Sequence, residues 1–368
     1  NPMDILCKSY GNFVQIPPGG FWGDSFKDQS GGEAGVYDPG TDTHYDGNDN
    51  GIYDPGYGFS ACTGATTVNG TGALFVHLGV EGEEHLYEPE PVFRFLRPAE
   101  AWTTMQFMEG NLDINGDGFK DVLVSSQSWT RWVKNGEGEV TGSVLRAGGV
   151  HAFLGRPVPV AGEKFVFCDG LDVFYGVNRD DSVSRVTTMG DLNGDSCTDF
   201  AFGGYGTDGE NVNQGMVWVG LGWGGDDCPT EPTFAALAPH FNSETLGYWV
   251  DGGKDVDGDE LPDLLVGAPG MRVDNVTVGG AYLVPGSYLN TLTFEPQSDP
   301  DVLKPSVNIV SPSSAVVLQV NGFTSGGLAG RSVSIIEDLG DGVSGIAVGA
   351  PLSTLSGTVQ SGGVAIHR

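Results

Sequence analysis

The sequence predicts an all-β protein built from repeated β-sheets, and three observations lead to this prediction. Glycine (60) and proline (21) are abundant among the 368 residues, which fits a chain with many tight turns. The sequence contains neither a long amphipathic helical pattern nor an apolar stretch long enough to span a membrane. An acidic loop that leads directly into a short apolar stretch recurs along the chain.

The acidic loop occurs in three close copies and one looser copy. The close copies are "LDINGDGFKDVLV" (112–124), "GDLNGDSCTDF" (190–200) and "KDVDGDELPDLLV" (254–266), and the looser copy is "YDGNDNGIYD" (45–54). Side chains with carboxylate or amide oxygens occupy relative positions 1, 3, 5 and 9 of every copy. They are Asp46, Asn48, Asn50 and Asp54; Asp113, Asn115, Asp117 and Asp121; Asp191, Asn193, Asp195 and Asp199; and Asp255, Asp257, Asp259 and Asp263.

Alternating oxygen ligands in a tight loop indicate Ca²⁺, because the chain curls round the ion and every second side chain points inward. One copy alone could be an ordinary acidic turn, but four copies in matched context favour calcium loops. The sequence therefore predicts about four Ca²⁺ sites. At position 7 each loop would add a backbone carbonyl, from Ile52, Phe119, Cys197 and Leu261.

These loops differ from EF-hand loops at position 12. An EF-hand places a bidentate Glu there, whereas this chain has Tyr57, Val124, Phe202 and Val266. The apolar residues that follow two of the loops read as buried strands rather than helices. We therefore expect each loop to join two strands.

The loops belong to a longer repeat. They start at residues 46, 113, 191 and 255, and a fifth, degenerate version starts at Asp338 and has Gly345 in place of the last Asp. Repeats of this length indicate a solenoid or a propeller. Each loop is followed, after a variable segment, by a strand that begins with glycine: 72–79, 148–155, 215–222, 279–286 and 362–368. In these strands Phe75, His151, Trp218, Tyr282 and Ala365 share one column.

Three segments resemble FG-GAP repeats, the units of the integrin α-subunit β-propeller. They are "DLLVGAPG" (263–270), "GIAVGAP" (345–351) and "LAGRSVSIIEDLGDG" (328–342). The resemblance runs from about residue 12 to the end and is strongest in the last two repeats. It implies four-stranded blades whose first two strands are joined by the Ca²⁺ loop, and an extracellular protein.

We expect a single propeller domain over 1–368 with five blades, at about 19–98, 99–170, 171–239, 240–320 and 321–368 plus 12–18. The fourth, outer strands would be 91–98, 163–170 and 233–239. Because the chain ends on a third strand, the segment 12–18 would supply the missing fourth strand and close the ring. Six or seven blades, or an open array completed by a neighbouring chain, are the alternatives.

Charge and cysteines bear on the environment of the protein. The net charge of −31 argues against nucleic acid as a partner and against insertion into membranes. Five scattered cysteines without a CxxC pair argue against a zinc site. Weak extracellular-type calcium sites would be empty in the cytosol, so we expect a secreted or cell-surface protein with the disulfides Cys7–Cys62 and Cys197–Cys228.

The sequence lacks the motifs of a serine-hydrolase elbow, a P-loop or a zinc protease, so we predict no enzyme and no catalytic residues. We expect a non-catalytic adhesion, protein-binding or self-assembly module. Its partner would bind the face opposite the calcium loops, where we place the connections 80–91, 156–164, 223–232 and 287–305. A glycan-binding propeller and a calcium-dependent polysaccharide lyase are the alternatives. The lyase would use the basic residues Arg94, Arg97, Arg131, Lys134 and Arg146.

Overall fold

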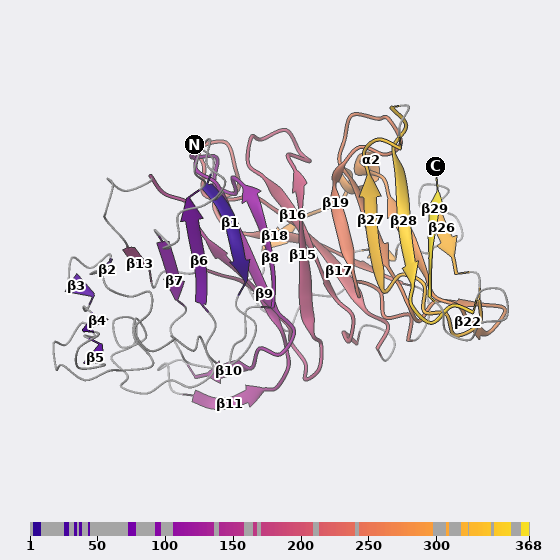
Figure 1. The fold of residues 1–368 in the computed structure, drawn as a ribbon, viewed down its shortest axis with the longest axis horizontal. Helices are drawn as coiled ribbons and strands as arrows, with labels where there is room; N and C mark the ends of the chain where they lie inside the picture. Colours follow the sequence, from indigo (N-terminus) through magenta and orange to yellow (C-terminus); the bar gives the residue numbers. More distant parts are fainter. Residues whose placement is uncertain are drawn as a thin grey trace.

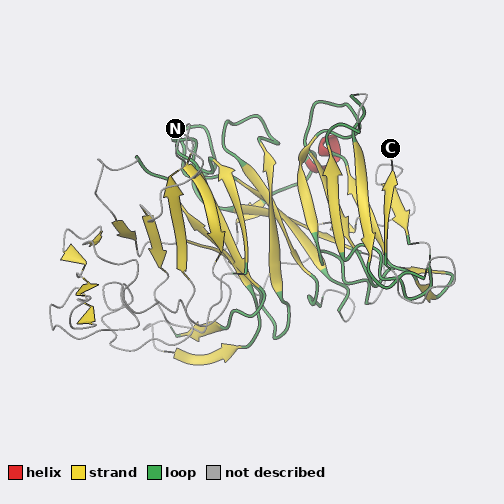
Figure 2. Cartoon of the chain, viewed as in Figure 1, coloured by secondary structure: helices red, strands yellow, loops and turns green. Residues whose placement is uncertain are grey.

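The computed structural model describes residues 106–135, 140–157, 171–208, 213–239, 243–296, 318–322, 324–339, 342–354 and 362–367, together with short strands elsewhere in the chain. The all-β prediction is confirmed, because the described residues form strands and loops with the one-turn helix α2 (Gly286–Leu289) as their helical element (Figure 2).

Four consecutive sheets are the blades of a β-propeller, numbered here by their sequence repeat (Figure 1). Blade 2 contains β8 (Phe107–Leu112), β9 (Asp121–Ser126), β12 (Gly149–Phe153) and β14 (Leu171–Tyr175). Blade 3 contains β15 (Val183–Gly190), β16 (Asp199–Gly204), β17 (Met216–Leu221) and β18 (Thr233–Ala238). Blade 4 contains β19 (Val250–Lys254), β20 (Asp263–Gly267), β23 (Gly280–Val284) and β26 (Leu318–Asn321). Blade 5 contains β27 (Ser332–Ile336), β28 (Gly345–Ala350) and β29 (Gly363–His367).

The first repeat contributes β6 (Ala73–Leu78) and β7 (Phe93–Leu96), which pair antiparallel, and β1 (Met3–Lys8) pairs with β6. Their sheet continues through β13 (Phe165–Phe167), β2 (Phe26–Asp28) and β3 (Glu33–Ala34). The remaining short strands form hairpins or extend blade 3. They are β4 (Tyr37–Asp38) with β5 (Thr43–His44), β10 (Arg131–Lys134) with β11 (Val140–Val144), β21 (Arg272–Val273) with β22 (Val276–Thr277), and β24 (Glu295–Pro296) and β25 (Val307–Asn308) beside β18.

The predicted outer strands are confirmed in two repeats and wrong in one. β7 and β18 lie within the predicted 91–98 and 233–239. In blade 2, however, β14 pairs with β12, whereas β13, from the predicted segment 163–170, runs parallel to β7. Both segments are short and apolar, so local pattern alone does not decide which one pairs with β12.

Consecutive blades are joined at the glycine that directly precedes each third strand. Gly148, Gly215 and Gly279 have φ of 74°, 79° and 75° and form parallel bridges to Val183, Leu246 and Ala329 of the next blade. A Cβ on Gly148 or Gly215 would lie 2.2 Å from backbone atoms of that partner. Glycine is therefore required here both for its positive φ and for the close approach of the two backbones.

The hydrophobic core lies between blades. Val217 and Val219 of β17 pack with Leu264 and Val266 of β20, and all four are fully buried. Blades 2 and 3 pack against each other through apolar side chains at equivalent positions of their strands, and so do blades 4 and 5. Burying one such side chain contributes about 1.5–3 kcal/mol, so these faces hold the array of blades together.

Blade 5 ends the described array with an exposed apolar face. Val364 and Ile366 of β29 are 68% and 60% exposed, although Val150, Val217 and Ala281, the counterparts of Val364, are fully buried against the next blade. The sheet of β6 and β7 lies at the opposite end of the row from β29 (Figure 1). The predicted closing strand 12–18 lies outside the described residues, so ring closure stays a prediction.

Candidate calcium loops

The structure places three of the four predicted loops between the first and second strands of blades 2, 3 and 4, as expected. The first loop, Asp46 to Asp54, lies outside the described residues. In each described blade, the residue at loop position 12 pairs with the third-strand residue that the repeats share in their alignment. The pairs are Val124 with His151, Phe202 with Trp218, and Val266 with Tyr282. The repeat alignment read from the sequence is therefore the alignment of the blades.

The first Asp of each loop organises the backbone around it. In blade 3 the amides of Gly194 and Asp195 donate to Asp191 Oδ1 at 2.7 and 3.1 Å, and the Ser196 amide donates to Asp191 Oδ2 at 2.9 Å. The loop thus curls round this carboxylate, and its second turn is fixed by Asp195, whose Oδ1 accepts from the Cys197 amide at 2.9 Å. A loop curled in this way turns its alternate side chains toward a common centre.

The loops of blades 4 and 2 repeat this arrangement. Asp255 accepts hydrogen bonds from the amides of 258–260 at 2.6–3.2 Å, and Asp113 accepts from the Gly118 amide at 3.0 Å. At position 3, the side-chain amides of Asn115 and Asn193 donate to the position-5 carboxylates, and the Asp257 carboxylate accepts from the Asp259 amide. At position 7, Phe119 and Leu261 donate their amides to Asp117 and Asp259 at 2.8 and 2.9 Å, as Cys197 does to Asp195.

The last Asp of each loop is a buried clamp as well as a predicted ligand. Asp121, Asp199 and Asp263 are fully buried. One oxygen of each accepts from the amide at loop position 2, and the other accepts from a glycine just after the third strand. The pairs of donors are Ile114 and Gly155, Leu192 and Gly222, and Val256 and Gly286, at 2.6–2.9 Å.

Burial of these carboxylates makes their negative charge costly. It raises the pKa of Asp199 to about 7 and that of Asp121 to about 6, and it also raises the pKa of Asp263. The neighbouring loop carboxylates add to the effect in each case. A bound cation would offset both the desolvation and the repulsion of these carboxylates.

The residues present fit a calcium ion. Oxygens of Asp255, Asp257 and Asp263 lie within 4.8 Å of one another, close enough to share one ion. In the loop of blade 2, Asp113 Oδ1 is buried without a hydrogen-bond partner. A buried carboxylate oxygen without a donor is costly, and a cation in the loop would satisfy it. An all-oxygen donor set suits Ca²⁺ rather than a thiophilic metal.

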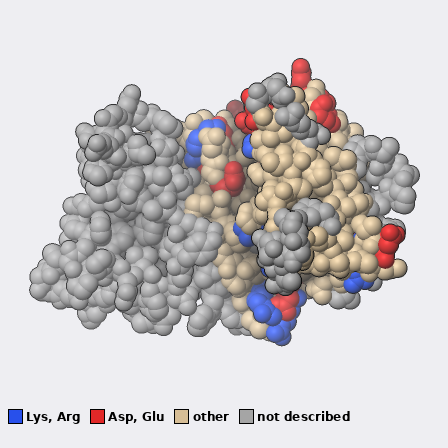
Figure 3. Space-filling model, turned by 45° about the vertical axis from the view of Figure 1, so that its right-hand side comes forward, with Lys and Arg blue, Asp and Glu red and all other residues tan. Residues whose placement is uncertain are grey.

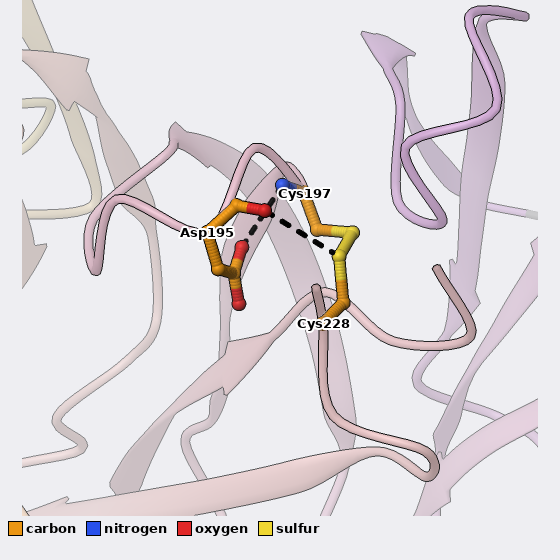
Figure 4. Close-up of side chains that lie close together, drawn as sticks. All are labelled: Asp195, Cys197 and Cys228. Carbon is orange, nitrogen blue, oxygen red and sulfur yellow. Dashed lines mark hydrogen bonds between the residues drawn. A yellow bond between two sulfur atoms is a disulfide. The ribbon is translucent and has the colours of Figure 1, made fainter. Parts of the chain in front are cut away.

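The Cys197–Cys228 disulfide predicted from the sequence is present (Figure 4). It links position 7 of the blade 3 loop to the connection after β17, and the Cys228 sulfur also approaches the Asp195 carbonyl at 3.8 Å. Sulfur in a disulfide is not a thiolate, so these cysteines do not ligate the ion through sulfur. Cys62, the predicted partner of Cys7, lies outside the described residues.

Neighbouring loops contact each other directly. The Thr198 amide donates to the Asp113 carbonyl at 2.7 Å, and the Asp113 amide donates to Thr198 Oγ1 at 2.9 Å. The Trp223 amide donates to the Ile114 carbonyl at 2.9 Å. The conformation of the blade 2 loop is therefore coupled to that of blade 3.

The expected position of two variable connections is wrong. The segment 223–232 carries Cys228, which is bonded to the calcium loop, and Gly286, which precedes 287–305, donates to Asp263 of a calcium loop. The antiparallel order explains this, because a third strand runs back toward the loop that joins the first two. The opposite side carries the second-to-third connections, such as the β10–β11 and β21–β22 hairpins, while α2 lies on the calcium side (Figure 1).

The fifth loop is reduced, as the sequence predicts. The Gly342 amide donates to Asp338 Oδ1 at 2.8 Å, so the first turn is kept. Gly345 stands where the clamp Asp would be, and a Cβ there would lie 2.5 Å from the His367 carbonyl oxygen. This position has no carboxylate and no room for one.

Sequence reasoning missed a group of residues at the start of the first strands. Phe107, Arg185 and Trp249 stand six residues before the starts of their loops, at one position of three consecutive repeats. The Arg185 guanidinium lies 3.6 Å from the centre of the Phe107 ring and 3.7 Å from that of Trp249. The repeat alignment contained this signal, but the residue types differ, so no motif marked it.

The fold and the loops together define an integrin-like propeller of FG-GAP repeats, which confirms the resemblance found in the sequence. Its relatives are integrin α-subunits. Integrin alpha-8 of Gallus gallus is 28% identical over 43% of this chain and 14% of the relative. Integrin alpha pat-2 of Caenorhabditis briggsae is 30% identical over 42% of the chain and 12% of the relative. Integrin alpha-M of Mus musculus is 37% identical over 24% of the chain and 8% of the relative.

The chain thus corresponds to a small part of these relatives' length, between 8% and 14% in these three. No protein-family model matches it. Within the part of the chain that the structure describes, no helix has the length and apolar character needed to span a membrane.

Proposed function

We propose that this chain is an extracellular, calcium-stabilised propeller that acts by binding, with no catalysis, as an adhesion or assembly module. The observation that carries the proposal is the threefold repetition of one loop geometry, with a buried Asp clamp and a carboxylate centre in blades 2, 3 and 4. The similarity to integrin α-subunits supports the same function.

Calcium in these loops would stabilise the blades rather than take part in chemistry. Each loop offers several oxygens of its own, which leaves little open coordination for a substrate. Sites of the extracellular type bind at about 10⁻⁴–10⁻³ M and fill only where calcium is abundant. The Cys197–Cys228 disulfide also fits an oxidising compartment. We therefore place the protein outside the cell or on its surface.

The side opposite the calcium loops is the proposed contact surface for a protein partner or a second copy. It carries the β10–β11 and β21–β22 hairpins, which differ in length and sequence. Figure 3 shows acidic side chains along the upper right edge and, at the lower end of the same view, a group of mainly basic side chains with acidic atoms among them. A surface with irregular loops and a local positive charge suits recognition of a protein better than support of a fold.

The lyase alternative loses part of its predicted basic cluster. Arg146 forms an ion pair with Asp180, and the Arg131 guanidinium lies 5.2 Å from the centre of the Tyr175 ring. Both bases therefore have partners within the protein. A glycan ligand is the second candidate, and the experiments below test for it.

Melting experiments with calcium and with EDTA test the proposal. At tenfold saturation one site adds about 1.4 kcal/mol to the free energy of unfolding, and four independent sites add roughly 5–6 kcal/mol. We expect EDTA to lower the melting temperature and calcium to restore it. An unchanged melting temperature would refute the calcium sites. Release of unsaturated products from acidic polysaccharides would refute a non-catalytic role, and a strict monomer at high concentration would exclude self-assembly.

A further inference from the structure

Two adjoining cavities lie where the first strands of blades 2 to 5 begin, which is the side away from the calcium loops. The larger, about 470 Å³, is lined by residues that include Arg185, Tyr248, Trp249, Arg331 and Val364. The smaller, about 270 Å³, shares Arg185 and Trp249 with it. A cavity of several hundred Å³ with an apolar lining and a few polar groups is the usual form of a ligand site.

The larger cavity is positively charged in a strongly acidic protein. The chain has 48 acidic and 17 basic residues, yet the described residues that line this cavity include two arginines and no carboxylate. Arg331 is exposed. Its guanidinium donates to the Tyr248 hydroxyl at 2.8 Å and lies 5.1 Å from the centre of that ring. These contacts hold the guanidinium at the cavity without neutralising it.

The smaller cavity also has two carboxyl groups, Glu109 and Asp251, among its lining residues. Asp251 accepts from the Ile335 amide at 2.7 Å and the Ser334 hydroxyl at 3.0 Å, so it ties blade 4 to blade 5. Burial and the nearby Asp251 charge raise the pKa of Glu109 to about 7, so this carboxyl is partly neutral at physiological pH. Arg185, held between Phe107 and Trp249, adds its charge to the boundary of the two cavities.

We propose that the larger cavity binds an acidic segment of a protein partner, with a carboxylate at Arg331 and an adjacent apolar side chain against Pro351 and Val364. This inference rests on the proposed function, whose contact surface it makes specific. A guanidinium binds a carboxylate with paired hydrogen bonds, and an apolar side chain of the ligand seated beside Arg331 would shield that contact from water.

The aromatic rings favour a peptide over a sugar in this cavity. A sugar ring stacks on a flat, uncovered aromatic face. Here the Arg185 guanidinium lies over the Trp249 ring, and the Tyr248 ring is flanked by the Arg331 guanidinium and by Tyr205, whose ring centre is 5.0 Å away. Arg331 and the apolar lining remain as the groups that face a ligand.

The probe is a capped five-residue peptide with two aspartates around a phenylalanine, labelled with a fluorophore, and its asparagine counterpart. Binding to the full chain is measured by fluorescence anisotropy in saturating calcium. A charge-assisted hydrogen bond is worth about tenfold in affinity or more, so Arg331→Ala should weaken binding of the aspartate peptide at least tenfold, and Arg331→Lys should restore part of it. Arg272→Ala is the matched control, since Arg272 is exposed on β21 and does not line the cavity.

The outcomes separate the proposal from its alternatives. Binding that needs both the aspartates and Arg331 supports it. Equal binding of the asparagine peptide, or no effect of Arg331→Ala, overturns it. Tighter Arg331-dependent binding of an oligogalacturonate than of the peptide overturns the protein assignment. A destabilised Arg331→Ala variant with unchanged peptide binding means that the cavity receives part of the chain itself, which also overturns the proposal. Calcium-dependent melting is measured separately, so the proposed function can stand or fall independently.

Discussion

Glu244 is a buried carboxyl whose ionisation should oppose folding at neutral pH. It precedes blade 4, is 1% exposed, and accepts a hydrogen bond from the Tyr282 hydroxyl at 3.1 Å. Burial raises its pKa from 4.5 to about 7, and the hydrogen bond from Tyr282 offsets only part of this effect. Glu244→Gln keeps the size of the side chain and an oxygen that can accept from Tyr282, but removes the titration.

The direction in which the free energy of unfolding changes with pH depends on whether the folded or the unfolded state keeps the proton. Below the unfolded pKa both states are protonated. As pH rises through 4.5 the unfolded chain loses its proton while the folded chain keeps it, so the free energy of unfolding falls until pH exceeds about 7. The full difference of 2.5 pKa units corresponds to about 3 kcal/mol, and about 2.5 kcal/mol of it falls between pH 5 and pH 8.

Urea unfolding at pH 5 and pH 8, in EDTA so that calcium binding does not contribute, measures this effect. The stability of Glu244→Gln relative to the parent should rise by about 2.5 kcal/mol from pH 5 to pH 8. Glu231→Gln, at an exposed position, is the control and should show no such change. A relative stability of Glu244→Gln that is the same at both pH values would refute the reasoning.

Two further predictions concern the loops and the termini. Asp195→Ala should remove one site and about 1.4 kcal/mol of calcium-dependent stabilisation at tenfold saturation. Asp341→Ala, in the reduced fifth loop, should change the calcium-dependent shift in melting temperature little. Equal effects of the two substitutions would contradict the difference between the loops. Deletion of 1–18 should expose the edge of β29 and cause aggregation beyond that of a 1–11 deletion, which removes β1 but keeps the predicted closing strand. Light scattering of the two truncations compares them, and a soluble, equally stable 1–18 deletion would exclude closure by 12–18.

Local patterns in the sequence were enough to predict the repeat, the second and third strands and the acidic loops. The strand Asp263–Gly267 is buried on both faces between blades. Its leucine and valine residues therefore identify it as a strand without any knowledge of the strands beside it. The loop pattern is equally local, because the first carboxylate of each loop bonds to amides within five residues of itself. Such features need no knowledge of distant parts of the chain.

Sequence reasoning was less successful for features whose position depends on which strands pair with each other. The choice of β14 over β13 as the outer strand of blade 2 depends on which of two similar apolar segments reaches β12. The position of 223–232 on the calcium side depends on the antiparallel path of β17, which the pattern of residues does not reveal. Pairing brings together residues far apart in sequence, and its energy is therefore absent from any local window.

The sequence alone determined that this protein repeats an acidic strand–loop–strand unit whose oxygens have the spacing expected of a calcium site, because loop curvature and the spacing of these side chains are set by neighbouring residues. The tertiary structure alone decided how distant side chains meet. Arg185, Trp249 and Arg331 come from three different blades and converge on one cavity. The last Asp of each loop becomes a buried clamp because the end of the third strand donates to it. Such contacts arise only when packing of apolar faces places one blade beside the next.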